Sequence, residues 1–223
     1  MIDIREEAYK VILKVLKKFH FSDNLLANSG KKIRKQNGDH NLFYTLVKGV
    51  IKMYAHLDYI AGLHGDKEKL DKTDLKYKVI LYIGLYQIKY LESIPDHAAV
   101  HETVALAKKK FGEGISGWVN AVLRSYLRNP KITYPEDPVR RMALEYSFPE
   151  ELITVFIDYW GEEEAEMLCM YFNDVPRLNI RINQLATTTD KCRNYFANKN
   201  IILEASEASK QMLTTNRFAQ QVI

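Results

Sequence analysis

The chain has 223 residues, of which 47% are hydrophobic and 27% are charged. These values allow one hydrophobic core, or one core with a smaller second unit, and the scarcity of glycine, proline and low-complexity stretches excludes fibrous and disordered classes. The opening sequence MIDIREEAYK has acids where a signal peptide has bases, and no apolar run approaches the roughly 18 residues of a membrane span. We therefore expect a cytoplasmic protein that does not associate with a membrane.

The net charge of +4 is unevenly distributed along the chain. Residues 1–130 contain 22 Lys and Arg against 14 Asp and Glu, whereas residues 131–223 contain 10 against 14. A phosphate-binding surface requires a basic part of this kind, although a solvated basic face that binds nothing has the same composition.

Residues 1–130 show the pattern of consecutive amphipathic helices. Asp3 is expected to cap the first, with Glu6 three positions on, as in a capping box. A short helix over SDNLLANSG is expected to end at Gly30, which leaves residues 31–35 in a loop. Asp39 then caps a third helix, and LDYIAGL reads as a turn.

The segment over residues 74–91 is predicted to be the central helix of this bundle. Its apolar side chains cover nearly the whole circumference, so it must be surrounded by other helices. Pro95 and Asp96 open the next helix, GEG at residues 112–114 ends it, and a further helix with an apolar inner face reaches residue 128.

Three prolines between residues 130 and 138 predict a connector. A helix over residues 148–160 should follow, capped by Ser147 and Glu150 and ended by Gly161, and EEEAEMLCMYF should form another. LNIRIN then predicts a strand, TTTDKCRNYFANK a capped helix and NIILEA a second strand. Two strands and one helix cannot cover a sheet, so either the chain is part of a longer protein or this unit docks on the bundle.

The stretch LYIGLYQIKYLESIPDHAAVHETVALAKK, followed by GWVNAVLR, resembles the NusB-like RNA-binding domain. The later stretch RRMALEYSFPEELITVFIDYWGEEEAEMLCMYFNDVPRLNIRIN is similar to the segment that joins this domain to the catalytic part of the RsmB (Sun/Fmu) family of 16S rRNA cytosine methyltransferases. The resemblance implies a mainly α fold: a NusB-like helical RNA-binding domain over residues 1–130, a short helical connector over 131–176, and the truncated start of an RRM-like α+β subdomain over 177–223.

The same resemblance implies 5-methylcytosine formation by a downstream domain that uses S-adenosylmethionine. The catalytic part of that family has a glycine-rich cofactor loop and cysteines in PC and TCS contexts, and none of these occurs here. Cys169 and Cys192 match neither context, so we expect buried or incidental thiols, with no catalytic residue and no cofactor on this chain. The implied partners are rRNA and the protein's own C-terminal methyltransferase domain.

His97 and His101 stand four residues apart, as zinc ligands on one helix face do. A metal site needs a third or fourth ligand, and Asp96 and Glu102 are expected to project away from that face. We therefore expect no metal, with His97 ordering the first helical turn by hydrogen bonding.

The candidate RNA-binding residues are Lys31, Lys32, Arg34, Lys35, Lys108, Lys109, Lys110, Arg124 and Arg128. Four charges within residues 31–35 repel one another unless a polyanion is near, which favours RNA there. The lysines at 108–110 are equally explained by the negative end of their helix. Arg124 and Arg128 fit either successive phosphates or acids such as Glu113.

Two functions therefore remain open. The bundle either places small-subunit rRNA for methyl transfer, by salt-dependent backbone and shape recognition, or serves as a NusB-like protein-interaction module or antitermination-type transcription factor. A face shared by residues 31–35, residues 108–110 and Arg128 favours RNA, whereas interspersed acids favour a protein partner.

Overall fold

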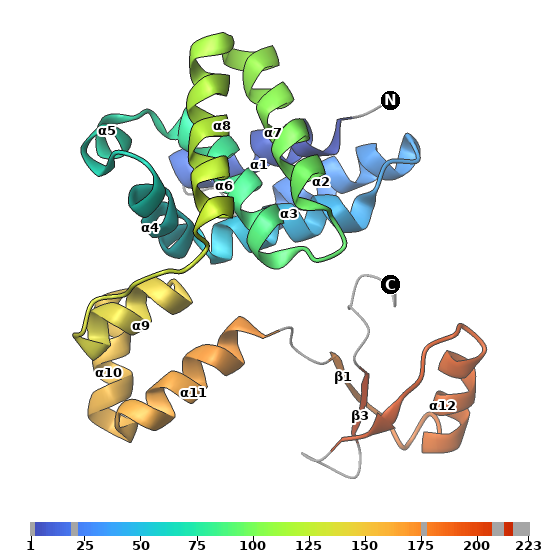
Figure 1. The fold of residues 1–223 in the computed structure, drawn as a ribbon. Helices are drawn as coiled ribbons and strands as arrows, with labels where there is room; N and C mark the ends of the chain where they lie inside the picture. Colours follow the sequence, from blue (N-terminus) through green and yellow to red (C-terminus); the bar gives the residue numbers. More distant parts are fainter. Residues whose placement is uncertain (1–2, 19–21, 175–177, 207–211, 216–223) are drawn as a thin grey trace. The chain divides into compact units, whose positions relative to one another are not determined.

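The computed structural model covers the whole chain and describes residues 3–18, 22–174, 178–206 and 212–215. The fold is mainly α, as expected, and the chain divides into two compact units, Met1–Glu166 and Met167–Ile223 (Figure 1). The described helices are α1 (Ile4–Lys18), α2 (Ser22–Lys35), α3 (His40–Lys52), α4 (Tyr54–His64), α5 (Lys67–Lys72), α6 (Leu75–Tyr90), α7 (Asp96–Phe111), α8 (Glu113–Arg128), α9 (Pro138–Tyr146), α10 (Glu150–Trp160), α11 (Glu162–Asn173) and α12 (Thr189–Ala197). The described strands are β1 (Leu178–Arg181), β2 (Glu204–Ala205) and β3 (Met212–Thr215).

The helix α6 is the central helix of the first unit, which confirms the prediction from its apolar circumference. It packs against α1, α3, α4, α7 and α8, and residues 79–85 are all buried (Figure 1). Gly84 allows the close approach of α7 and α8, because a Cβ at this position would lie 2.9 Å from both Leu123 Cδ1 and Thr103 Cγ2. The expected all-helical bundle thus surrounds one continuous core.

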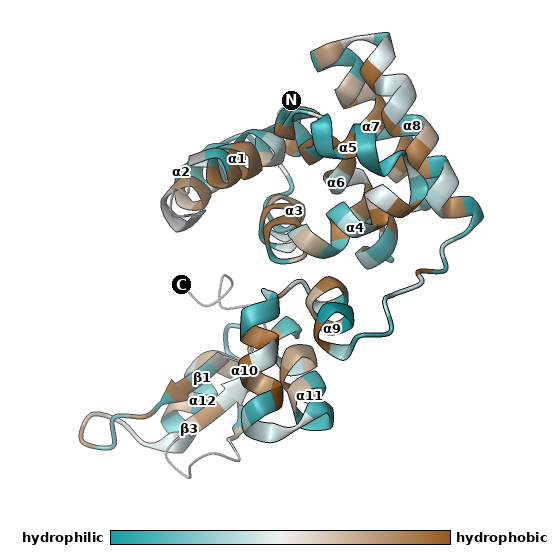
Figure 2. Cartoon of the chain, turned by 90° about the vertical axis from the view of Figure 1, so that its left-hand side faces the viewer, coloured by the Kyte–Doolittle hydropathy of each residue, from teal (hydrophilic) through white to brown (hydrophobic). Residues whose placement is uncertain are grey.

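The predicted ends of several helices are confirmed by their cap geometry. Asp39 Oδ1 accepts a hydrogen bond from Leu42 N at 2.9 Å, and Asp74 Oδ1 accepts one from Lys76 N at the same distance. Gly112 separates α7 from α8 with a φ of +83°, a conformation that glycine adopts without strain. Hydrophilic and hydrophobic bands alternate along α7 and α8, as expected for amphipathic helices (Figure 2).

The prediction that α2 ends at Gly30 and leaves residues 31–35 in a loop is wrong. Gly30 is buried inside the helix, where a Cβ would lie 2.7 Å from the hydroxyl oxygen of Tyr44 on α3. Ile33 is fully buried one turn later and anchors the extension in the core. The glycine therefore serves close packing between α2 and α3, and the basic residues form the last turns of α2.

Two further helices differ from the sequence prediction. The LDYIAGL segment belongs to α4 instead of a turn, because Leu57 and Ile60 are fully buried in the core. The helix α9 was not expected, although Asp137 caps it by accepting a hydrogen bond from Arg140 N at 2.8 Å and Pro138 stands in its first turn.

The contact between α4 and α9 explains why the predicted capping box of α10 does not form. Ser147 ends α9 in the left-handed conformation with a φ of +61°, and its Oγ accepts a hydrogen bond from Ala55 N at 3.0 Å. The N-cap of α10 is Pro149, which makes no side-chain capping bond. Gly161 ends α10 at a φ of +85°, as predicted.

A buried histidine strengthens the same contact. His56 Nδ1 lies 2.9 Å from Leu144 O, and burial lowers the pKa of the imidazole to about 4. The ring is therefore neutral at neutral pH, and its Nδ1–H donates to the carbonyl. Tyr59 adds a hydrogen bond from its hydroxyl to Thr133 O at 2.6 Å, so α4 holds both the connector and α9.

The second unit contains a small antiparallel sheet in the order β1-β3-β2. Both outer strands pair antiparallel with β3, so β1 and β2 run parallel to each other on either side of it. The predicted β-α-β unit is therefore split by a third strand that the sequence did not indicate, and the predicted second strand is reduced to Glu204–Ala205. Its core comprises Ile182, Ile201, Leu203 and Leu213, with Ile180, Cys192 and Phe196 packed against them.

Candidate nucleic-acid interface

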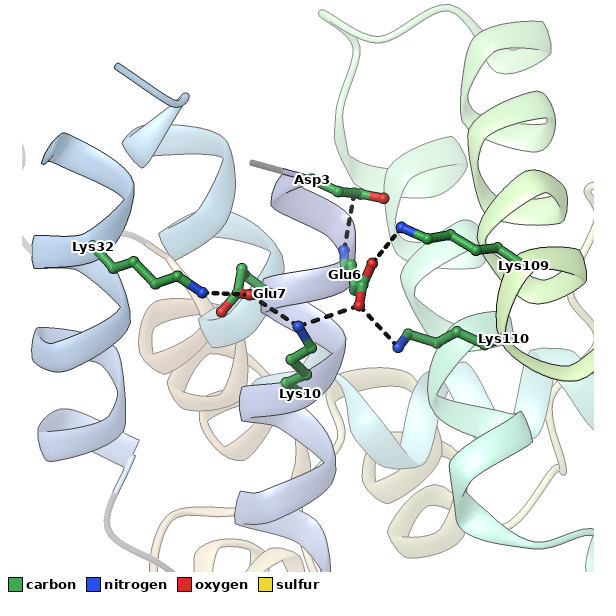
Figure 3. A network of polar contacts seen from close by, with 7 residues as sticks. All are labelled: Asp3, Glu6, Glu7, Lys10, Lys32, Lys109 and Lys110. Carbon is green, nitrogen blue, oxygen red and sulfur yellow. Dashed lines mark hydrogen bonds and ion pairs between the residues drawn. The ribbon is translucent and has the colours of Figure 1, made fainter. Parts of the chain in front are cut away.

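Two glutamates of α1 meet lysines of α2 and α7 (Figure 3). The Glu6 carboxylate lies 2.7 Å from Lys109 Nζ, 3.1 Å from Lys110 Nζ and 3.2 Å from Lys10 Nζ. Glu7 Oε1 lies 3.0 Å from Lys10 Nζ. It lies at the same distance from Lys32 Nζ. We call these six residues the glutamate–lysine network.

The network holds both carboxylates in the charged state. Hydrogen bonds from Lys109 and Lys110 lower the pKa of Glu6 to about 2, against the opposing effect of burial. Burial alone would raise the pKa of Glu7, but the hydrogen bonds from Lys32 and Lys10 outweigh it, so this pKa is lowered as well. Glu6 in turn raises the pKa of Lys109.

Sequence reasoning missed Glu6, Glu7 and Lys10 as members of the basic region. Glu6 was read as the partner of Asp3 in a capping box, and half of that prediction is confirmed, because Asp3 Oδ1 accepts from Glu6 N at 3.1 Å. The Glu6 side chain, however, points to the lysines (Figure 3). The charge alternation in REEAYK was the available signal, since Glu6 and Lys10 stand four residues apart on α1.

Three of the candidate cations share an exposed face of α2. Lys31, Arg34 and Lys35 occupy positions i, i+3 and i+4, which adjoin on a helix surface, and all three are exposed. Among the described residues no acid forms an ion pair with any of them. We call these three residues the α2 basic face; Lys32, in contrast, turns toward Glu7.

The remaining candidates lie on α7 and α8. Lys108 of α7 pairs with Glu113, the first residue of α8, at 2.6 Å between Nζ and Oε1. Arg124 Nε donates to Asn120 Oδ1 at 2.9 Å, one turn away on α8. Arg128 is exposed in the last turn of α8 and forms no ion pair within the described ranges.

The structure thus divides most of the candidate cations into two classes. Lys32, Lys108, Lys109 and Lys110 are each paired with a carboxylate, which is the interspersed pattern that favours a protein partner. The α2 basic face and Arg128 carry charges that no described carboxylate balances, which is the pattern that favours a polyanion. Arg124 belongs to neither class, because its partner is the amide of Asn120.

The histidine pair does not assemble a metal site in the part of the chain that the structure describes. No group of three His, Cys, Asp or Glu side chains with metal-binding geometry occurs there. Contrary to expectation, Glu102 lies beside its neighbour, with Oε1 3.3 Å from His101 Nδ1. The expected hydrogen bond from His97 does not form among the described residues either, and the N-cap of α7, Pro95, makes no side-chain capping bond. Within the described residues, no helix has the length and apolar character needed to cross a bilayer.

Comparison with known proteins identifies the first unit's bundle. The NusB family matches residues 3–128, which is more than half of the chain and includes α1 to α8. This chain belongs to the NusB family. The NusB domain therefore contains the glutamate–lysine network, the α2 basic face and Arg128. The transcription antitermination protein NusB of Lacticaseibacillus casei is 37% identical over 90 residues, which cover 38% of this chain and 63% of that protein.

Longer relatives extend the similarity beyond the NusB domain. The probable ribosomal RNA small subunit methyltransferase B of Bacillus subtilis is 33% identical over 209 residues, which cover 93% of this chain and 46% of that protein. The corresponding protein of Synechocystis sp. is 31% identical over 216 residues, which cover 96% of this chain and 48% of that protein. The chain spans about half the length of these relatives, and the resemblance read from the sequence is confirmed.

A solved structure supports the fold of the whole chain. The crystal structure of PH0851 matches with a TM-score of 0.62 at 12% identity and covers 100% of this chain and 51% of that one. At this identity the match concerns the fold alone.

Proposed function

We propose that this chain is the rRNA-binding portion of an RsmB-type methyltransferase. In this proposal the NusB domain places small-subunit rRNA so that a downstream domain can form 5-methylcytosine. The methyltransferase relatives support it, because they match more than nine-tenths of the chain. The α2 basic face carries the argument for RNA, because its three exposed charges have no carboxylate partner among the described residues.

The chemistry of methyl transfer belongs to the downstream domain in this proposal. S-adenosylmethionine supplies the methyl group when it is bound there. The thiols of this chain do not fit a nucleophile, because Cys169 is fully buried and Cys192 packs against the core of the second unit. The role of this chain's residues is to bind the RNA backbone and to fix its position.

Binding through the α2 basic face should depend strongly on salt. Each cation that neutralises a phosphate releases condensed counterions, so the logarithm of the association constant falls by roughly 0.7 to 0.9 per phosphate for each tenfold rise in salt. Loss of three contacts should therefore reduce the slope of the logarithm of the association constant against the logarithm of the salt concentration by about two.

The test is a titration of the 223-residue chain with a labelled rRNA hairpin at several salt concentrations. The variant K31A/R34A/K35A should bind at least tenfold more weakly at low salt, with a shallower salt dependence. The matched control is K67A/K69A/K72A on α5, which removes the same charge from a helix where Asp71 and Asp66 already pair two of the lysines. If both variants lost affinity equally, the loss would be explained by net charge alone, and a specific RNA site on α2 would be contradicted.

The placement role needs a second experiment. We expect the full-length protein without residues 1–130 to need far more rRNA to saturate methyl transfer than the intact protein does. Unchanged saturation would argue against placement even if the NusB domain binds RNA.

The glutamate–lysine network supports a second candidate function. Carboxylates interspersed among the lysines suit a protein partner, because a protein can offer charges of both signs. If the 223-residue chain fails to bind the hairpin even at low salt, the NusB domain is better described as a protein-interaction module.

A further inference from the structure

The first unit buries only part of the apolar surface of the helix α10. Its sequence EELITVFIDYW places aliphatic or aromatic residues at seven of eleven positions. Ile153 is fully buried, but Leu152, Val155, Tyr159 and Trp160 are exposed. Hydrophobic bands recur along this helix (Figure 2). An ordinary surface helix exposes its polar side instead.

The four exposed residues form a continuous stripe, which we call the α10 ridge. Leu152, Val155 and Tyr159 are spaced i, i+3 and i+7, and Trp160 lies beside them. The rings of Tyr159 and Trp160 are in contact, with centroids 5.7 Å apart. Tyr159 is 77% exposed and Trp160 is 54% exposed. Large exposed aromatic side chains in one stripe are typical of a binding surface, and Tyr and Trp contribute most to such interfaces.

The charges near the ridge disfavour RNA as its partner. Glu151 and Asp158 are exposed on α10, on the side next to Val155, and residues 131–223 carry 14 acids against 10 bases. Phosphates would be repelled from an acidic rim, although the two aromatic rings alone could stack on bases. A protein surface with an apolar centre and basic edges fits both features.

The comparisons indicate which protein surface this is. The NusB family match ends at residue 128, before α10 begins. A match over 209 of the 223 residues must include α10, and the relatives that show it are about twice as long as this chain. The ridge therefore belongs to the part shared with the longer methyltransferases, not to the part that the NusB family explains.

We propose that the α10 ridge is the docking surface for the methyltransferase half of the same full-length protein. This inference rests on the proposed function, because that function supplies the missing half. Tyr159 and Trp160 insert into an apolar site of that half, and Glu151 and Asp158 face basic residues at its edge. The NusB domain is then held at a fixed position relative to the catalytic site, as placement of RNA requires.

Hydroxyl-radical footprinting tests the docking directly, in the absence of RNA. Modification of Tyr159 and Trp160 should be at least fivefold slower in the full-length protein than in the 223-residue chain. Leu63, which is 45% exposed on α4, serves as the internal reference and should react at the same rate in both. Unchanged rates at the two aromatic residues overturn the proposal. Protection that appears only when rRNA is added also overturns the proposal and assigns the ridge to RNA. Protection that grows with the concentration of the 223-residue chain overturns it too and assigns the ridge to self-association.

A pair of variants gives a second, independent measurement. In the full-length protein, Y159S/W160S should increase the rate of limited proteolysis between the two halves at least fivefold, whereas the control L63S should leave it unchanged. Cleavage of the double variant at the wild-type rate overturns the proposal. Neither measurement uses RNA binding, so failure of the hairpin titration and failure of the docking are distinguishable.

Discussion

At the scale of single residues, Glu6 and Glu7 control how much positive charge the NusB domain presents. Two carboxylates face four ammonium groups in the network, so half of this local positive charge is neutralised within the protein (Figure 3). An incoming phosphate must compete with the carboxylates for Lys32, Lys109 and Lys110. The network therefore links the stability of the bundle to its affinity for polyanions.

The variant E6Q should bind the rRNA hairpin more tightly than the wild type. Loss of the carboxylate releases Lys109 and Lys110, and an ion pair at a protein surface contributes roughly 0.2 to 1 kcal/mol, which is roughly 1.4- to fivefold in affinity. The control E92Q removes an exposed carboxylate outside the network and should change affinity less. Equal gains in the two variants would show that only the net charge matters.

The same variant should be less stable at neutral pH, by about 1 kcal/mol after allowance for solvent screening at Lys109 and Lys10, whose side chains are partly exposed. The pKa of Glu6 is about 2 in the folded chain, below its ordinary value of 4.5, so the carboxylate stabilises the fold above about pH 4.5. This contribution is lost as the pH falls from 4.5 toward 2, because the unfolded chain takes up the proton first. Urea unfolding should show a difference between wild type and E6Q at pH 7 that nearly disappears at pH 2. A difference that is constant with pH would contradict the charged state assigned to Glu6.

At the scale of helices, two glycines provide a matched test of packing. Gly84 of α6 has no room for a methyl group, since a Cβ would lie 2.9 Å from side-chain atoms of α7 and α8, whereas nothing lies within 4 Å of the corresponding position at Gly117 of α8. G84A should lower the free energy of unfolding by about 1 to 3 kcal/mol through overpacking. G117A should raise it by about 0.5 to 1 kcal/mol, because alanine favours a helix more than glycine does. Thermal or urea unfolding shows whether each variant is less or more stable than the wild type. Stabilisation by G84A would contradict the tight contact of α6 with α7 and α8.

The sequence predicts correctly those helices whose structure depends only on the spacing of their apolar residues and on the capping residues at their ends. Asp39, Asp74 and Gly112 act within one helical turn, so local pattern was sufficient for α3, α6 and α7. Gly30 looks the same as Gly112 in the sequence, yet its role depends on Tyr44 in the next helix. A local pattern contains no information about such a contact.

The candidate site shows the same limit. The nine cations could be named from the sequence, but the ion pairs of Lys109 and Lys110 with Glu6 join residues more than one hundred positions apart. Only the packing of α7 on α1 reveals which charges are balanced within the protein. The third strand of the second unit was missed for a related reason, because β3 takes its place by pairing with β1 and β2.

At the scale of the whole molecule, the two units differ greatly in the size of their cores. The NusB domain buries seven consecutive residues in α6 alone, whereas four side chains are buried in the hydrophobic core of the described part of the second unit. Small units with so little buried apolar area are marginally stable. Stability should therefore be unevenly distributed along the chain.

Native-state hydrogen exchange of the 223-residue chain measures this difference. Backbone amides of residues 79–85 in α6 should exchange with a free energy close to that of global unfolding, and those of Met212–Thr215 in β3 should exchange with a free energy lower by about 3 kcal/mol or more. Protection of β3 should rise in the full-length protein if the rest of that protein covers the small sheet. Equal protection of α6 and β3 in the 223-residue chain would mean that the two units unfold together. In that case the second unit would gain its stability from the bundle and not from a downstream domain.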